Sequence, residues 1–358
     1  MRAVRFHDRK DLRLDDVAPP GALEPDDVLV KPFLCGICGS DLHEYLHGPI
    51  SSTREPHPFT GASMPQILGH EFSGRVEAVG SDVTHLSVGD RVSIQPQMAP
   101  ADEYYGKRRL YQLSPQVGVV GLSWWWGGMA ELAIVKDYSA FRVPDEVTDI
   151  QAALVEPAAV AVHAIDRAAV KPGSSVLISG FGPIGALCGL AARAAGAATI
   201  IVTETNQKRL DAAAALLPGA VMVNPKRDNL ADVVRAVTEE GIGVDAAIEC
   251  AGVGPALNAC VAAVRRQGTV VQLGLQTSPV EVNLLDWVFK DIIVRGSICY
   301  PSDSWPRVMS LIGSGLFPVE KIVTSIVELD DALPLGFERL LDPDGDELKV
   351  LLRISASD

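Results

Sequence analysis

Three glycines with the spacing Gly-x-Gly-x-x-Gly, at Gly180, Gly182 and Gly185, constrain the fold of this chain more than any other segment. An apolar run precedes them, and a stretch with helical periodicity follows. The first glycine permits a tight turn, the second lets the backbone approach a ligand, and the third lets a helix pack closely on a strand. Glu204 stands nineteen residues after Gly185, at the end of a second apolar run. This order of strand, glycine turn, helix, strand and acid predicts a dinucleotide-binding unit, with the pyrophosphate at the helix N-terminus.

From about residue 149 onward, short apolar runs alternate with stretches of helical periodicity. Helices are expected over residues 184–191, 209–217 and 231–239. The predicted strands are residues 176–179, 199–203, 221–223, 246–249, 269–273 and 292–295. Strands joined by helices in this way predict a doubly wound parallel sheet, and therefore an α/β fold.

The part of the chain before residue 149 is rich in short β-like runs separated by turn residues. Residues 28–32, 74–79 and 90–94 are predicted strands, and Gly-, Pro- and Asp-containing turns lie between them. This pattern predicts a compact β-rich or barrel-like unit. A last apolar run at 348–354 predicts a strand that returns to the same unit.

Composition excludes several classes of protein. A chain of 358 residues is long enough for two domains. A net charge of −14 without a Lys/Arg cluster argues against a nucleic-acid partner. No apolar stretch reaches about 18 residues and no apolar leader follows Met1, so neither a membrane span nor a secretory signal is expected. Six cysteines are few for this length, which favours a reducing compartment and a cytoplasmic location.

A second group of residues has the chemistry of a metal site. Cys35 and Cys38 form a Cys-x-x-Cys pair, and His70, Glu71 and Glu156 follow. Thiolate, imidazole and carboxylate are the ligands that Zn²⁺ takes, and a catalytic zinc keeps one position open. The cysteine pair also fits a redox pair, half of a structural zinc site, or two buried thiols. No second cysteine pair has ligand spacing, which favours a catalytic metal, but spacing does not decide which cysteine binds it.

Further motifs give the chain a family resemblance. They are residues 35–45, 57–61, 67–74, 88–92, 156–157, 180–185 and 296–300. Over nearly its whole length the chain resembles the zinc-containing medium-chain dehydrogenases, the alcohol and polyol dehydrogenase superfamily. Residues 57–61 and 296–300 are similar to the (R,R)-2,3-butanediol dehydrogenase group in particular. The resemblance implies a GroES-like β-rich catalytic domain over 1–157 with 299–358, and a Rossmann domain that binds NAD over 158–298.

The resemblance also implies roles at the metal. Cys38 and His70 match zinc ligands of the family, and the third protein ligand matches either Glu71 or Glu156, with Glu156 slightly favoured. Asp41 matches a carboxylate that orients the metal-bound histidine.

Two further residues match a proton relay. Ser40 and His43 correspond to the groups that carry a proton from the substrate oxygen to solvent. The expected catalytic set is therefore Ser40, His43, Glu71 and Glu156.

On the cofactor side, Glu204 matches the acid that binds the adenosine ribose hydroxyls. A carboxylate there repels a 2′-phosphate, so NAD is expected rather than NADP, although Lys208 and Arg209 leave NADP open. The other residues matched to cofactor binding are Gly180, Gly182, Pro183, Ile184, Gly185, Arg209, Gly252, Val253, Gly274, Leu275, Ser297 and Lys349.

The expected activity is hydride transfer between NAD and a secondary alcohol, with (R,R)-2,3-butanediol and acetoin as substrates. Another polyol or secondary alcohol (sorbitol-like or threonine-like) is the alternative. An inactive relative is a third reading, but such a protein would be expected to lack Cys38, His70 or the carboxylate. A homodimer or homotetramer is expected.

Two departures from the family pattern are visible. Many relatives carry a structural zinc in a four-cysteine lobe, whereas no cysteine occurs here between Cys38 and Cys188. One catalytic zinc and no structural zinc are therefore expected. Residues 124–126 are three tryptophans where relatives tend to have glycine, and they are expected either to fill space or to line the substrate entrance.

Overall fold

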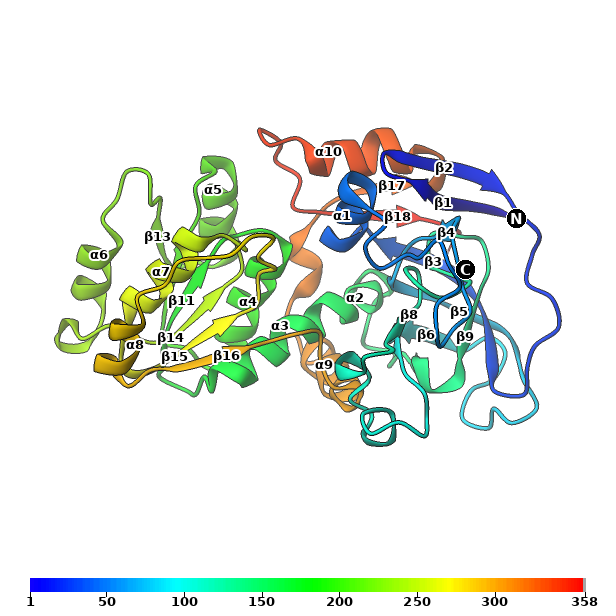
Figure 1. The fold of residues 1–358 in the computed structure, drawn as a ribbon, viewed down its shortest axis with the longest axis horizontal. Coiled ribbons are helices and arrows are strands. Elements are labelled where there is room, and N and C mark those ends of the chain that lie inside the picture. Colours follow the sequence, from blue (N-terminus) through cyan, green and yellow to red (C-terminus); the bar gives the residue numbers. More distant parts are fainter. Residues whose placement is uncertain (357–358) are drawn as a thin grey trace. The chain divides into compact units, whose positions relative to one another are not determined.

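The computed structural model describes residues 1–356 and divides into two compact units (Figure 1). The first unit contains Met1–Glu156, Pro301–Ser314 and the chain from Val323 onward. The second contains Pro157–Tyr300 and Gly315–Ile322. Among the described residues, no helix is both long enough and apolar enough to cross a membrane.

A seven-stranded sheet forms the body of the first unit. Its order is β10-β6-β5-β3-β18-β17, and β9 also pairs with β3. The strands are β3 (Asp27–Gly36), β5 (Glu71–Val79), β6 (Arg91–Ile94), β9 (Ala133–Lys136), β10 (Ala140–Arg142), β17 (Val323–Glu328) and β18 (Lys349–Arg353). The predicted return strand is confirmed as β18, which pairs antiparallel with β3.

Smaller sheets and four helices complete the first unit. The order β2-β1-β4 makes a three-stranded sheet, and β7 pairs with β8. These elements are β1 (Arg2–Asp8), β2 (Asp11–Asp16), β4 (Gln66–Ile67), β7 (Gln97–Met98), β8 (Gly118–Val119), α1 (Gly39–His47), α2 (Asp149–Ala153), α9 (Trp305–Gly313) and α10 (Glu338–Leu341). Val30, Phe72, Val76 and Leu352 belong to a buried core that joins the sheets.

The second unit is built on a six-stranded parallel sheet with the order β13-β12-β11-β14-β15-β16 (Figure 1). Its strands are β11 (Ser175–Ser179), β12 (Thr199–Thr203), β13 (Val221–Val223), β14 (Val244–Glu249), β15 (Val264–Gln272) and β16 (Ile293–Gly296). All six predicted strands are present, and the α/β fold with a β-rich first unit is confirmed. The central strand β11 is buried because it has a neighbour on each side and helices over it.

Helices connect these strands and cover the sheet. They are α3 (Val155–Ala168), α4 (Pro183–Ala194), α5 (Gln207–Leu216), α6 (Leu230–Val237), α7 (Gly254–Ala263) and α8 (Leu284–Lys290). α4 packs against α5, whereas α7 packs against both α6 and α8. α6 begins where the side chain of Asn229 accepts the backbone N–H of Ala231, a standard N-cap.

Candidate functional site

Cys38, His70 and Glu71 form a compact cluster in the first unit. Each offers one ligand atom, and these atoms all lie within 4.8 Å of one another. Strand register explains this proximity, because β3 and β5 pair antiparallel with Gly36 opposite Glu71. Cys38 stands two residues after Gly36 and is the N-cap of α1, whereas His70 directly precedes β5. The sheet therefore joins residues that are more than thirty positions apart in sequence.

The neighbours of His70 hold its ring from two sides. Ser40 Oγ lies 3.1 Å from His70 Nε2, and Asp41 Oδ1 lies 3.5 Å from Nδ1. Asp41 is fully buried, and its other oxygen accepts the backbone N–H of Cys38 at 2.9 Å. Burial lowers the pKa of the His70 imidazole, but the charges of Asp41 and Cys38 outweigh it, so the pKa lies well above its usual value.

The donor set fits a zinc ion. A thiolate, an imidazole and a carboxylate are three ligands of the kind found at catalytic zinc sites, and three are the usual number there. Asp41 Oδ1 and His70 Nδ1 face each other as a buried ion pair, but within residues 1–356 neither atom has a hydrogen-bond partner. A divalent cation at the cluster would offset the negative charge of the Cys38 thiolate and of the buried Asp41 and Glu71 carboxylates.

Lys349 forms a buried ion pair with Glu71. Its Nζ donates to Glu71 Oε2 and to the carbonyl oxygen of Ile37, the latter at 2.9 Å. Burial lowers the pKa of the Lys349 ammonium, but the adjacent Glu71 carboxylate raises it above its usual value. The resemblance assigned Lys349 to the pyrophosphate. That assignment stays a prediction, and the contacts that the structure gives its Nζ are with Glu71 and the Ile37 carbonyl.

Glu156 and Cys35 lie outside the three-residue cluster. Glu156 is in the first turn of α3, is 6% exposed, and its charge contributes to the raised pKa of His70. Of the two carboxylates that the sequence left open, only Glu71 has an oxygen within the cluster of ligand atoms, as far as residues 1–356 show. Cys35 is fully buried, and burial raises the pKa of its thiol well above the usual value.

The two predicted relay residues both lie on α1. Ser40 is half-buried beside His70, whereas His43 is exposed, with its ring centroid 6.1 Å from that of His47. The helix therefore carries one hydroxyl at the cluster and one imidazole at the surface.

The glycine turn has the geometry that its sequence predicted. Gly180 has φ +94°, a conformation that favours glycine. A Cβ on Gly185 would lie 2.0 Å from the carbonyl oxygen of Gly180, so the helix packs there only with glycine. Gly182 is the N-cap of α4, and Pro183 and Ile184 begin its first turn. Glu204 follows β12, and its Oε2 accepts the backbone N–H of Phe181 at 2.9 Å.

The other predicted cofactor residues of the second unit follow the carboxyl ends of its strands, where open α/β sheets bind ligands. Arg209 lies in the first turn of α5, where its backbone N–H is accepted by Asn206. Gly252 and Val253 follow β14, Gly274 and Leu275 follow β15, and Ser297 follows β16.

Sequence reasoning missed one buried acid at this edge. Glu249, the last residue of β14, is fully buried, and its carboxylate accepts hydrogen bonds from Ala251, after β14, and from Gln272, the last residue of β15. A charged residue at the end of an otherwise apolar strand was the signal that could have identified it.

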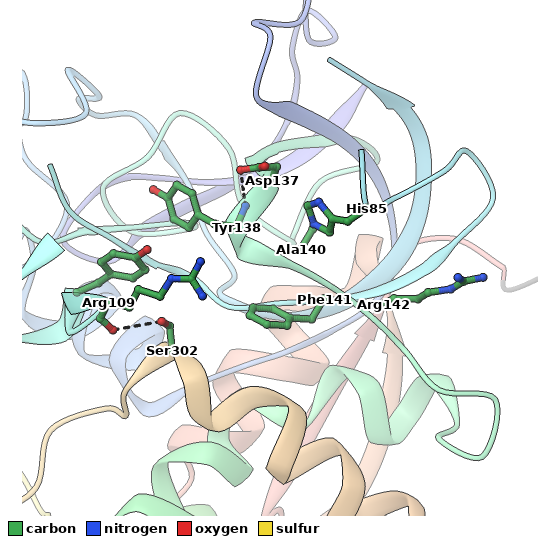
Figure 2. Close-up of a pocket in the computed structure, with 9 residues that line it drawn as sticks. His85, Arg109, Asp137, Tyr138, Ala140, Phe141, Arg142 and Ser302 are labelled. Carbon is green, nitrogen blue, oxygen red and sulfur yellow. Dashed lines mark hydrogen bonds between the residues drawn. The ribbon is translucent and has the colours of Figure 1, made fainter. Parts of the chain in front are cut away.

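Two cavities lie elsewhere in the first unit and contain none of the predicted site residues. One has a volume of about 380 Å³ (Figure 2), and the Ser302 hydroxyl at its edge donates to the carbonyl oxygen of Arg109 at 3.2 Å. The other has a volume of about 500 Å³ and is lined in part by Trp125, which is 51% exposed. Trp124 and Trp126 pack against the core, as expected for rings that fill space, and Trp126 also lines this second cavity.

Comparisons with known proteins agree with this geometry. The family model for zinc-binding dehydrogenases matches residues 183–314, and the model for the GroES-like domain of alcohol dehydrogenases matches residues 24–145. The (R,R)-butanediol dehydrogenase of Bacillus subtilis is 39% identical over 355 residues, which cover 99% of each chain. D-xylulose reductase A of Aspergillus niger is 32% identical over 90% of this chain and 88% of its own.

Solved structures give the same result. The crystal structure of 2R,3R-butanediol dehydrogenase from Bacillus subtilis superposes with a TM-score of 0.92 at 38% identity, covering 99% of both chains. A Sinorhizobium meliloti structure bound to NADP superposes with a TM-score of 0.87 at 29% identity over 98% of both chains. The matched models, the full-length relatives and the cluster of zinc-type ligands together show that this chain belongs to the zinc-binding alcohol dehydrogenase family, whose GroES-like and parallel-sheet units it contains.

Proposed function

We propose that the protein is an NAD-dependent zinc dehydrogenase that interconverts (R,R)-2,3-butanediol and acetoin. The observation that carries the proposal is the convergence of Cys38, His70 and Glu71 in a chain that is 39% identical, along its whole length, to an (R,R)-butanediol dehydrogenase.

Cys38, His70 and Glu71 would hold one zinc ion, and Glu156 is placed to affect the charge of the site. When bound, zinc supplies a Lewis acid for the substrate oxygen, and the nicotinamide supplies the hydride acceptor. Asp41 fixes the orientation of His70. The missing cysteines between Cys38 and Cys188 support a single zinc per chain.

Ser40 and His43 would move the substrate proton. The Ser40 hydroxyl lies beside the cluster, 3.1 Å from His70 Nε2, and can accept a proton from an alcohol bound there. His43 lies exposed on the same helix, so it can pass that proton to solvent. Positioned proton transfer of this kind contributes about 10²- to 10⁴-fold to a rate.

Glu204 supports NAD over NADP. Its carboxylate contacts the glycine turn, and a 2′-phosphate brought to the same place would meet a like charge. The NADP-bound Sinorhizobium meliloti relative shows that NADP occurs among structural neighbours. Titration of the purified protein with both cofactors tests the preference: NAD⁺ should bind at least tenfold more tightly, and a tighter Kd for NADP⁺ would contradict the proposal.

A homo-oligomer is the expected assembly. β16 is an edge strand of the parallel sheet in the described chain, and Ile293 on it is 44% exposed. The adjacent helix α8 exposes Val288 and Phe289 by 71% and 69%. An open apolar edge favours pairing with another chain. Light scattering coupled to size exclusion should give a dimer or tetramer, and a monomer mass at micromolar concentration would refute it.

A substrate panel tests the activity itself. Initial rates with NAD⁺ on (R,R)-, meso- and (S,S)-2,3-butanediol, xylitol, sorbitol and threonine should give the highest kcat/KM for the (R,R) diol. The similarity to a D-xylulose reductase makes a polyol the second candidate, and a higher kcat/KM for xylitol would select it. Metal analysis of the same sample should find about one zinc per chain, and removal of zinc by a chelator should abolish the activity.

A further inference from the structure

A single buried carboxylate fastens the loop that follows β14. Glu249 is fully buried at the end of this strand. Its Oε1 accepts the backbone N–H groups of Ala251 and Gly252, each at 2.8 Å. Gly252 has φ +68°, so the chain turns sharply at this point.

The same carboxylate also fastens the loop that follows β15. Oε2 of Glu249 accepts Gln272 Nε2 at 2.6 Å, and that nitrogen also donates to the carbonyl oxygen of Gly274 at 2.6 Å. The backbone carbonyl of Glu249 accepts the N–H groups of Leu273 and Gly274 at 3.0 and 2.8 Å. A Cβ on Gly274 would lie 2.6 Å from Glu249 Oε2, so the two loops meet closely around this acid.

The hydrogen-bond pattern favours the ionised form of Glu249. Its two oxygens face N–H donors, and Gln272 presents Nε2 because the same atom must donate to Gly274. Burial raises the pKa of the Glu249 carboxyl above its usual value, and the surrounding N–H groups offset only part of that rise. A loop clamp by itself needs no net charge, and burying a charge costs free energy, so a role for the charge is indicated.

We propose that Glu249 is a positioning residue that fixes residues 250–253 and 273–275 against the nicotinamide half of the dinucleotide, and that its charge favours the oxidised cofactor. The inference rests on the proposed function, which places a nicotinamide cofactor at the carboxyl edge of this sheet. The nicotinamide ring carries a positive charge in NAD⁺ and none in NADH. A charge pair about 10 Å apart at an effective dielectric of about 20 changes a binding constant by about tenfold.

Calorimetric titration of the zinc-loaded protein with NAD⁺, NADH and ADP-ribose tests the proposal. ADP-ribose lacks only the nicotinamide. Glu249→Gln should weaken NAD⁺ about tenfold, NADH about threefold or less, and ADP-ribose hardly at all. Equal weakening of all three ligands, or unchanged NAD⁺ affinity, would overturn it.

A matched control lies on the same strand. Asp245, near the amino end of β14, accepts the backbone N–H of Ser175 at 2.8 Å and is paired with Arg265. Asp245→Asn also removes one carboxylate from β14 and should leave the NAD⁺ to NADH affinity ratio unchanged. A shift of that ratio as large as for Glu249→Gln would show that the effect is not specific to Glu249.

A second variant covers the case in which Glu249→Gln does not fold. Gln272→Met keeps the carboxylate but cuts its link to the loop after β15, and it should weaken NAD⁺ about threefold without affecting ADP-ribose. Unchanged NAD⁺ affinity in this variant would contradict the clamp. If the unaltered protein binds none of the three ligands, the proposed function fails, whereas normal wild-type binding with unaffected variants refutes only the role of Glu249.

Discussion

Replacing Lys349 by methionine tests whether the Lys349 ammonium and a zinc ion compete for the Glu71 carboxylate. Both side chains of this pair are almost fully buried, at 2% and 1% exposure. Removing one member of a buried ion pair lowers the free energy of unfolding by about 3–5 kcal/mol, because the other charge remains buried and unpaired. Methionine keeps the length of the lysine stem, so the loss would come mainly from the charge rather than from a cavity.

Zinc should reduce that loss if Glu71 is a ligand. A bound cation takes over the neutralisation of Glu71, so the zinc-loaded variant should lose only about 1–2 kcal/mol. The loss of stability thus differs by about 2 kcal/mol between the zinc-free and the zinc-loaded variant. By linkage, Lys349→Met should therefore bind zinc about 30-fold more tightly than the unaltered protein does.

Denaturant unfolding with and without zinc, together with a competitive zinc titration, measures both quantities. Arg353→Met is the matched control, since Arg353 lies on the same strand and pairs with Glu328 at 3.3 Å on the surface. Its loss should stay below about 1 kcal/mol in either state. An equal loss for Lys349→Met with and without zinc would refute the assignment of Glu71 to the metal.

Three further predictions concern other parts of the molecule. Gly185→Ala should lower both stability and NAD⁺ affinity, because the added Cβ meets a backbone oxygen at 2.0 Å. Gly182→Ala should lower only the NAD⁺ affinity, because no atom lies within 4 Å of its added Cβ. Thermal melts and calorimetric titrations of the two variants measure both quantities. Ser40→Ala should retain its zinc by metal analysis and lose about 10²-fold in kcat, and full activity would exclude its role as a proton relay. Burial raises the pKa of Asp245, but hydrogen bonds from Ser175 and Arg265 outweigh this and lower it. Its contribution to stability is therefore present above the unfolded-state pKa near 4 and is lost as pH falls through the lower folded-state pKa, so Asp245→Asn should flatten the pH dependence of stability below about pH 4.

Local sequence signals predicted the parallel sheet and its glycine turn. Strand, turn and acid lie close together in the chain, and each has its own steric or electrostatic requirement, as Gly185 shows. The start of β15 was predicted at residue 269, whereas the strand begins at Val264. Val264 pairs with Val244 and Thr269 pairs with Ala246, and the residues between them form an irregularity in the register where Gln267 has φ +58°.

Partners that depend on tertiary pairing could not be predicted in the same way. Lys349 and Glu71 are 278 residues apart, and only the order of β5, β3 and β18 in one sheet brings them together. Cys38 became distinguishable from Cys35 because one caps a helix at the cluster and the other is buried in the strand. The role of Glu249 could not be predicted, because a single acid in a sequence does not indicate which two loops its carboxylate contacts.

The central position of β18 determines where the chain can be shortened. This strand lies between β3 and β17, so a fragment that stops before residue 349 would leave the longest strand of the first unit with an open, apolar edge. Such a fragment would keep Cys38, His70 and Glu71 yet be expected to aggregate rather than bind metal. Engineered truncations and fusions at this end should therefore be placed beyond Ser355, because Ile354 and Ser355 still donate hydrogen bonds to β3.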